Sequence, residues 1–222
     1  MIELFSTAGL LVPLKGSSSI GIFPLDSKPY GLSYAEHAQN FWKWLLPIPA
    51  SDSPANDRTG EKCTVGQSNT NSSVFYLVEG EGEVKRKCTV PAGKGLLIPI
   101  MNVEISDKET PGSSVEELIN AAKTDQNNVN SLYLKIDNDE YTYDDLLKYR
   151  LPQPTVFQVT FADYGLFGVK EGGNSTVAAD GFYILTEPLT AGSHIVHFRS
   201  SLLGSEAEPA FAQDVSYDIV AR

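Results

Sequence analysis

The sequence predicts a mainly β protein: a single β-sandwich or jelly-roll-like domain with two short helices as insertions. Short segments in which apolar and polar residues alternate recur along the chain, with turn residues between them. Two cysteines, Cys63 and Cys88, bracket one of these strand-like segments. The 222 residues contain no fixed repeat and no linker that divides them. We therefore expect one sandwich domain at residues 31–222, with residues 1–30 as an N-terminal extension or edge strands.

The first part of the chain predicts edge strands and then a helix. Residues 8–14 and 20–24 are apolar and bounded by Gly, Ser and Pro, which is typical of strands at an edge or wrapped around the body. Ser33 and Glu36 have the spacing of a capping box, and they predict a helix over residues 33–46 that ends before Pro47.

The middle of the chain predicts three strands, at residues 74–78, 84–90 and 95–101. Residues 79–82, with the sequence Glu-Gly-Glu-Gly, favour a hairpin turn between the first two strands. A second capping box, formed by Ser114 and Glu117, predicts a helix over residues 114–123. A half-buried strand at 132–136 and a helical turn at 144–149 follow.

The last third predicts strands at 157–161, 182–185, 194–199 and 215–219. In the strand predicted at 194–199, His194 and His197 are three residues apart. Because side chains alternate between the two faces of a strand, the two imidazoles face opposite sides of the sheet. This spacing argues against joint metal binding by the pair.

Cysteine usage and charge bear on the compartment. A Cys63–Cys88 disulfide, which favours an extracellular or cell-surface protein, is preferred over two buried thiols in a cytosolic protein. The formal net charge of −11 argues against nucleic acid and anionic membranes as partners. No apolar stretch has the length of a transmembrane segment, and no signal peptide is recognisable. Two glycosylation sequons begin at Asn71 and Asn174.

A resemblance adds to this interpretation. An ordered set of motifs spans residues 30–222: Trp42-Lys43-Trp44; Asp57-Arg58-Thr59-Gly60 with Cys63; Cys88-Thr89-Val90-Pro91-Ala92-Gly93-Lys94 with Pro99 and Asn102; Ile136-Asp137; Tyr149-Arg150; Pro188-Leu189; Gly192-Ser193-His194-Ile195-Val196-His197-Phe198; and Asp214-Val215-Ser216-Tyr217. The set resembles a family of uncharacterised secreted proteins from environmental bacteria and archaea. The resemblance implies an exported, single-domain, mostly-β protein, and it implies no activity, cofactor or catalytic residue.

Calcium is the one cofactor for which the sequence offers ligands. Asp137 and Asp139 place hard oxygen ligands in one predicted turn, although the spacing lacks the glycine and the bidentate glutamate of an EF-hand loop. Acidic turns of this kind also occur without any ion. We otherwise expect no cofactor.

A ligand cleft is the second hypothesis for a site. It would gather Trp42 or Trp44, as an aromatic platform, with the polar side chains of Asp57, Asn102, Glu104 and His194. Two carboxylates about 5 to 10 Å apart could act on a sugar. The competing interpretation, which we favour, places the apolar helix face that contains Trp42 in the core, with Trp44 beside it, and uses the polar groups to cap turns.

These patterns predict an extracellular or cell-surface structural or binding protein. Its expected partners are copies of itself or other surface proteins, and glycans. Residues 8–14 form an apolar segment ahead of the domain, and such an arm can complete the sheet edge of another subunit. The alternative is a carbohydrate-binding or carbohydrate-active protein, with a hydrolase as the less favoured form. No Gly-x-Ser-x-Gly motif or other catalytic constellation is recognisable.

Overall fold

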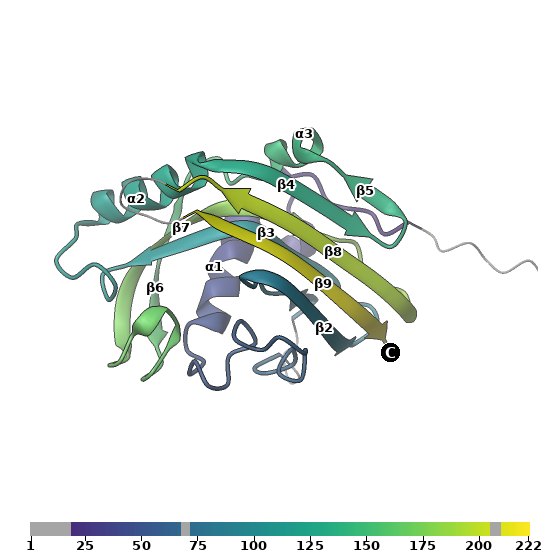
Figure 1. Ribbon diagram of the computed structural model, residues 1–222, viewed down its shortest axis with the longest axis horizontal. Coiled ribbons are helices and arrows are strands. Elements are labelled where there is room, and N and C mark those ends of the chain that lie inside the picture. Colours follow the sequence, from purple (N-terminus) through teal and green to yellow (C-terminus); the bar gives the residue numbers. More distant parts are fainter. Residues whose placement is uncertain (1–18, 68–71, 205–209) are drawn as a thin grey trace, which may run out of the picture.

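The computed structural model describes residues 19–67, 72–204 and 210–222, and within these it confirms a mainly β sandwich (Figure 1). The first sheet has the order β1-β3-β7-β6 and the second has the order β2-β9-β8-β4-β5. The strands are β1 (Val74–Tyr76), β2 (Gly82–Val90), β3 (Gly95–Ser106), β4 (Val129–Ile136), β5 (Asp139–Tyr141), β6 (Thr155–Phe161), β7 (Gly173–Leu185), β8 (Gly192–Leu202) and β9 (Phe211–Ala221). The predicted arm at residues 8–14 lies outside the described residues.

The two predicted capping boxes are confirmed. Ser33 and Glu36 cap α1 (Tyr34–Leu45), and Ser114 and Glu117 cap α2 (Val115–Asn127), which runs four residues beyond its predicted end. In each box the serine hydroxyl accepts from the glutamate N–H, and the glutamate carboxylate accepts from the serine N–H. The shorter helices are α3 (Tyr143–Leu146), η1 (Pro29–Gly31), η2 (Leu147–Tyr149) and η3 (Leu166–Gly168).

The two main helices cover opposite faces of the first sheet. On α1, Gln39 donates a hydrogen bond to Thr155 Oγ1 of β6, at 2.6 Å. On the opposite face, Arg150 links α2 to the sheet. It pairs with buried Asp180 of β7 at 2.7 Å and donates to the Lys123 carbonyl of α2 at 3.0 Å. Figure 1 shows α2 at one end of the long strands β3 and β7.

The predicted hairpin at residues 79–82 is wrong, because β1 and β2 belong to different sheets. The chain crosses between the sheets instead, and β2 pairs parallel with β9. A long-range contact stabilises this crossing, since the Gly80 N–H donates to Gln213 Oε1 at 3.1 Å. The glycine is also required locally, because a Cβ at Gly80 would lie 2.8 Å from the Val84 side chain. A local Gly-rich pattern could not reveal a partner 133 residues away.

The Cys63–Cys88 disulfide is confirmed, with a Cα–Cα distance of 6.1 Å. Only Cys88 lies in a strand, however, and Cys63 lies in a turn-rich loop. The bond therefore ties that loop to β2 rather than joining two strands, and closing a loop of this length contributes about 3 kcal/mol. The same loop covers the outer edge of β2, where Lys87 N–H donates to the Thr59 carbonyl at 2.9 Å.

The described part of the N-terminal extension packs on the sandwich. Ile20 belongs to the hydrophobic core. The strand expected at residues 20–24 is reduced to a single bridge between Ile22 and Thr186, and Pro24 has no N–H to extend the pairing. None of the helices in the described parts of the chain has the length and apolar character needed to cross a bilayer.

Candidate functional site

The structure does not bring the six residues of the predicted cleft together. Asp57 lies in the loop that covers β2, where its two carboxylate oxygens accept from the N–H groups of Thr59 and Lys62, each at 2.8 Å. Burial alone would raise the pKa of Asp57, but the hydrogen bonds from the backbone outweigh it and the pKa is lowered. Asp57 therefore organises its own loop.

His194 lies in the second sheet, on β8. One ring nitrogen is 2.8 Å from Asp137 Oδ2 and the other is 2.9 Å from the Thr190 carbonyl oxygen. The other Asp137 oxygen accepts from the Ile195 N–H at 2.8 Å. Asp137, in the turn between β4 and β5, therefore uses both of its carboxylate oxygens to bind β8. Among the described residues, no group of three or more His, Cys, Asp or Glu side chains is arranged to hold a metal ion.

The two tryptophans differ in environment. Trp42 is 3% exposed and donates its indole N–H to the Tyr183 hydroxyl at 3.2 Å, so it belongs to the core. Trp44 is half-buried and lines a cavity of about 320 Å³. Its ring lies 5.2 Å from the Tyr76 ring at an interplanar angle of 33°. Gly66 permits this arrangement, because a Cβ there would lie 2.9 Å from the indole nitrogen of Trp44.

Asn102 and Glu104 lie two residues apart on β3. Glu104 and Thr155 are both register partners of Ala179, so Glu104 faces the α1 side of the first sheet. Glu104 is 4% exposed, and no described residue reaches its carboxyl oxygens in good hydrogen-bond geometry. Burial and the neighbouring Glu109 raise the pKa of Glu104 well above its ordinary value. Neither Asn102 nor Glu104 lines the cavity at Trp44 or the second cavity, at Tyr149, that is described below.

Glu79, which the sequence analysis treated only as a turn residue, is a second buried acid. Its Oε1 accepts from the Asn102 N–H at 2.9 Å and from Gln213 Nε2 at 3.2 Å. The residue keeps part of its surface exposed, but its carboxyl group is enclosed, and burial raises the pKa of Glu79 to about 8. The fold therefore favours the protonated form of Glu79.

Arg86 is the buried cation that sequence reasoning missed. It is 2% exposed, and its guanidinium lies over the Tyr217 ring. Its hydrogen bonds go to the carbonyl oxygens of Ala55, Asp57, Val78 and Glu79 and to the Tyr217 hydroxyl, at 2.6 to 3.3 Å. The alternation on β2 contains the signal, because Arg86 occupies the inward position between Val84 and Cys88.

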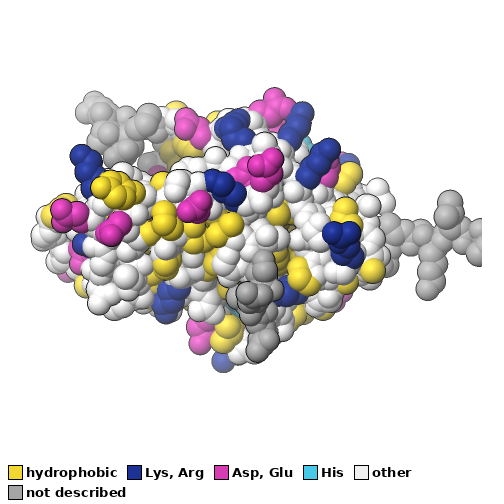
Figure 2. Space-filling view, turned by 90° about the horizontal axis from the view of Figure 1, so that it is seen from below, with side chains coloured by type: hydrophobic (Ala, Val, Ile, Leu, Met, Phe, Trp, Pro, Cys, Tyr) yellow, Lys and Arg dark blue, Asp and Glu magenta, His cyan; other side chains and the backbone are white. Residues whose placement is uncertain are grey.

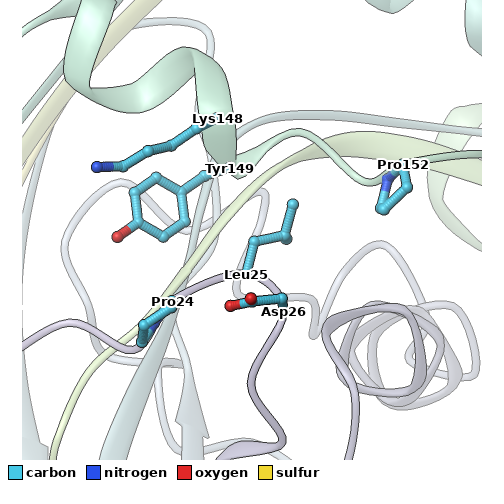
Figure 3. Close-up of a pocket in the computed structure, with 6 residues that line it drawn as sticks. All are labelled: Pro24, Leu25, Asp26, Lys148, Tyr149 and Pro152. Atoms are coloured by element: carbon cyan, nitrogen blue, oxygen red, sulfur yellow. The ribbon is translucent and has the colours of Figure 1, made fainter.

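A second cavity, of about 380 Å³, lies between the segment that begins at Pro24 and the η2 turn (Figure 3). Figure 3 shows Leu25 pointing between Tyr149 and Pro152, while the Asp26 carboxylate and the Tyr149 hydroxyl point to the same side. Burial raises the pKa of Tyr149. The lining is mostly apolar, with one carboxylate and one ammonium group, and it contains no base and nucleophile within hydrogen-bond reach of each other.

The middle of the outer edge of β6 is left uncovered in the described structure. The Val156 carbonyl of β6 accepts from Gln39 on the side away from β7, at 3.5 Å. Because backbone groups alternate in an antiparallel pair, Gln158 and Thr160 direct their N–H and C=O groups to the same outer side. Within the described ranges, no group pairs with these backbone atoms there. β6 therefore presents a short open stretch at Gln158 and Thr160, bounded by the Gln39 bond to Val156 and by the bond from the Ala162 N–H to the Leu46 carbonyl at 3.1 Å.

The sequence of β6 itself lacks the features that normally protect an edge strand. Its seven residues carry no charge, and the register with β7 runs from Thr155↔Ala179 to Phe161↔Gly173 without a bulge. Natural proteins usually place Lys, Pro or a bulge on such an edge to prevent pairing with another chain. Elsewhere the surface is mixed: Figure 2 shows acidic and basic side chains interspersed on the face seen from below, with hydrophobic side chains between them.

In comparisons with known proteins, no family model, no curated protein and no solved structure matches the chain.

Proposed function

We propose that the chain is a structural protein of an extracellular assembly, in which copies associate by pairing β-strands at the edge of β6. The observation that carries this proposal is the regular, uncharged and uncovered edge at Gln158 and Thr160. The disulfide supports an oxidising compartment, since such bonds persist mainly outside the cytosol. The buried carboxyl groups of Glu79 and Glu104 serve the fold in this proposal rather than a reaction.

The Gln158→Pro variant tests the proposal, because proline removes the outward N–H and leaves the bonds to β7 in place. We expect the unmodified chain to form assemblies larger than its 24.2 kDa chain mass in light scattering, and Gln158→Pro to remain monomeric. Gln158→Ala is the matched control, since it loses the side-chain bond to Thr176 but keeps the N–H, and it should assemble. An unmodified chain that stays monomeric at all concentrations would overturn the proposal.

Carbohydrate binding is a second candidate function, favoured by the Trp44–Tyr76 pair in its cavity. A half-buried indole beside Asn40 and Lys43 offers an apolar face and polar groups together. We expect neutral polysaccharides to retard the chain in affinity electrophoresis. Trp44→Leu should weaken binding roughly tenfold, because an aromatic contact is worth about 1.4 kcal/mol. Equal migration with and without polysaccharide would exclude this function.

A further inference from the structure

We infer that the strand added to the β6 edge is residues 8–14 of a second copy, so that copies join head to tail. This inference rests on the proposed function and names the partner of its open edge. The donor and acceptor are both uncharged: the segment 8–14 reads Ala-Gly-Leu-Leu-Val-Pro-Leu, and β6 reads Thr-Val-Phe-Gln-Val-Thr-Phe. The seven-residue segment is longer than the open stretch at Gln158 and Thr160, so it has enough residues to cover that stretch.

The place where the N-terminal segment joins the body is set by three backbone contacts. Ile22 bridges Thr186, the Phe23 N–H donates to the Leu185 carbonyl, and the Glu187 N–H donates to the Gly21 carbonyl. This antiparallel pairing means that the chain, followed back from residue 23 to residue 21, runs away from the half of β7 that pairs with β6. In Figure 1 the purple start of the described chain and β6 accordingly lie toward opposite ends of the molecule.

The segment is too short to reach the β6 edge of its own copy. The nearest point of β6 is Thr155, which pairs with Ala179, seven residues along β7 from Thr186. With three more residues from Ile22 back to Ser19, the separation along the strand direction is about 33 Å. The link of residues 15–18 spans at most about 18 Å between Leu14 and Ser19. A neighbouring copy is therefore the acceptor.

A donor at one end and an acceptor at the other make a heterologous contact. Such contacts generate rings when the rotation between copies closes and filaments when it does not. Each copy then gives one strand and receives one, and the main-chain hydrogen bonds of strand addition supply the contact.

Two defective variants distinguish this arrangement from its alternatives. The acceptor variant is Gln158→Pro, which keeps residues 8–14 intact. The donor variant carries Leu10→Lys and Val12→Lys in the full chain, and it keeps the β6 edge intact. We expect each variant alone to be monomeric, and a one-to-one mixture to give a species of twice the 24.2 kDa chain mass and no larger. The mixture stops at two chains because one copy lacks a donor and the other lacks an acceptor.

Other outcomes overturn the inference in distinct ways. A donor variant that still assembles, while Gln158→Pro does not, shows that β6 edges pair with each other; the proposed function then stands and the inference fails. A donor variant that is monomeric beside a Gln158→Pro variant that assembles places the acceptor elsewhere. If Gln158→Pro fails to fold, as judged by circular dichroism, Thr160→Lys replaces it, because an edge lysine opposes pairing without removing an N–H.

Discussion

Replacing Arg86 with leucine is expected to lower the free energy of unfolding by about 3–5 kcal/mol, the largest single effect that we predict. Leucine preserves apolar volume near Tyr217 but removes the guanidinium donor from the carbonyl groups of Ala55, Asp57 and Glu79, while the Val78 carbonyl keeps the bond from the Tyr217 hydroxyl. Because Arg86 is 2% exposed and its carbonyl partners are at least partly buried, water replaces these bonds only in part while the chain stays folded. Urea denaturation monitored by tryptophan fluorescence measures the loss.

Arg58→Leu is the matched control for this experiment. Arg58 also donates to backbone carbonyl oxygens, those of Glu81 and Glu83, but it does so at the exposed surface. We expect its loss to cost less than about 1 kcal/mol, since water takes over the released acceptors. Equal effects of the two substitutions would contradict the role assigned to Arg86.

The second large effect concerns pH. The pKa of Glu79 in the fold is about 8, above its ordinary value of 4.5, so folding favours the protonated acid. The unfolded chain releases this proton as the pH rises above 4.5, and the folded chain does not until about pH 8. The contribution of Glu79 to stability is therefore largest below pH 4.5 and falls as the pH rises, by on the order of 3 kcal/mol between pH 5 and 8.

Glu79→Gln should remove this part of the pH dependence. Glutamine keeps an oxygen for the Asn102 N–H and Gln213 Nε2, and it resembles the protonated acid in shape and charge. Denaturation curves at pH 5 and pH 8 measure the change, and the variant should exceed the unmodified chain in stability at pH 8. Glu81→Gln removes the same charge at an exposed position and should leave the slope unaltered. A parallel pH dependence for the unmodified chain and Glu79→Gln would contradict the burial of this carboxyl group.

The elements that the sequence predicts correctly depend on local chemistry. The capping boxes at Ser33 and Ser114 each bind backbone N–H groups within a few residues. The alternation of apolar and polar residues around His194 indicates a strand with one face in the core. The sandwich follows from such segments together. The crossing at Glu79 and Gly80 could not be predicted in this way, because its stabilising partners are Asn102 and Gln213.

The candidate sites were less accessible from sequence than the fold. Polar residues such as Asp57 and Asn102 look alike in a sequence whether they line a cleft or bind backbone groups, and only three-dimensional proximity separates the two uses. In the sequence Arg86 stands between Lys85 and Lys87, which is typical of an exposed basic run, but the alternation of β2 places it inward. The open edge of β6 had no signal at all, because an edge is defined by which strands are absent beside it.

Amide hydrogen exchange at Gln158 and Thr160 tests strand addition most directly, because the N–H groups of these residues form the proposed contact. The measurement compares the assembled unmodified chain with the variant that carries Leu10→Lys and Val12→Lys. Phe157 and Val159 direct their N–H groups to β7 and provide the internal reference, expected to exchange slowly in both samples. We predict slow exchange at Gln158 and Thr160 in the assembled chain and fast exchange in the variant. Fast exchange at both residues in an assembled chain would contradict strand addition at β6.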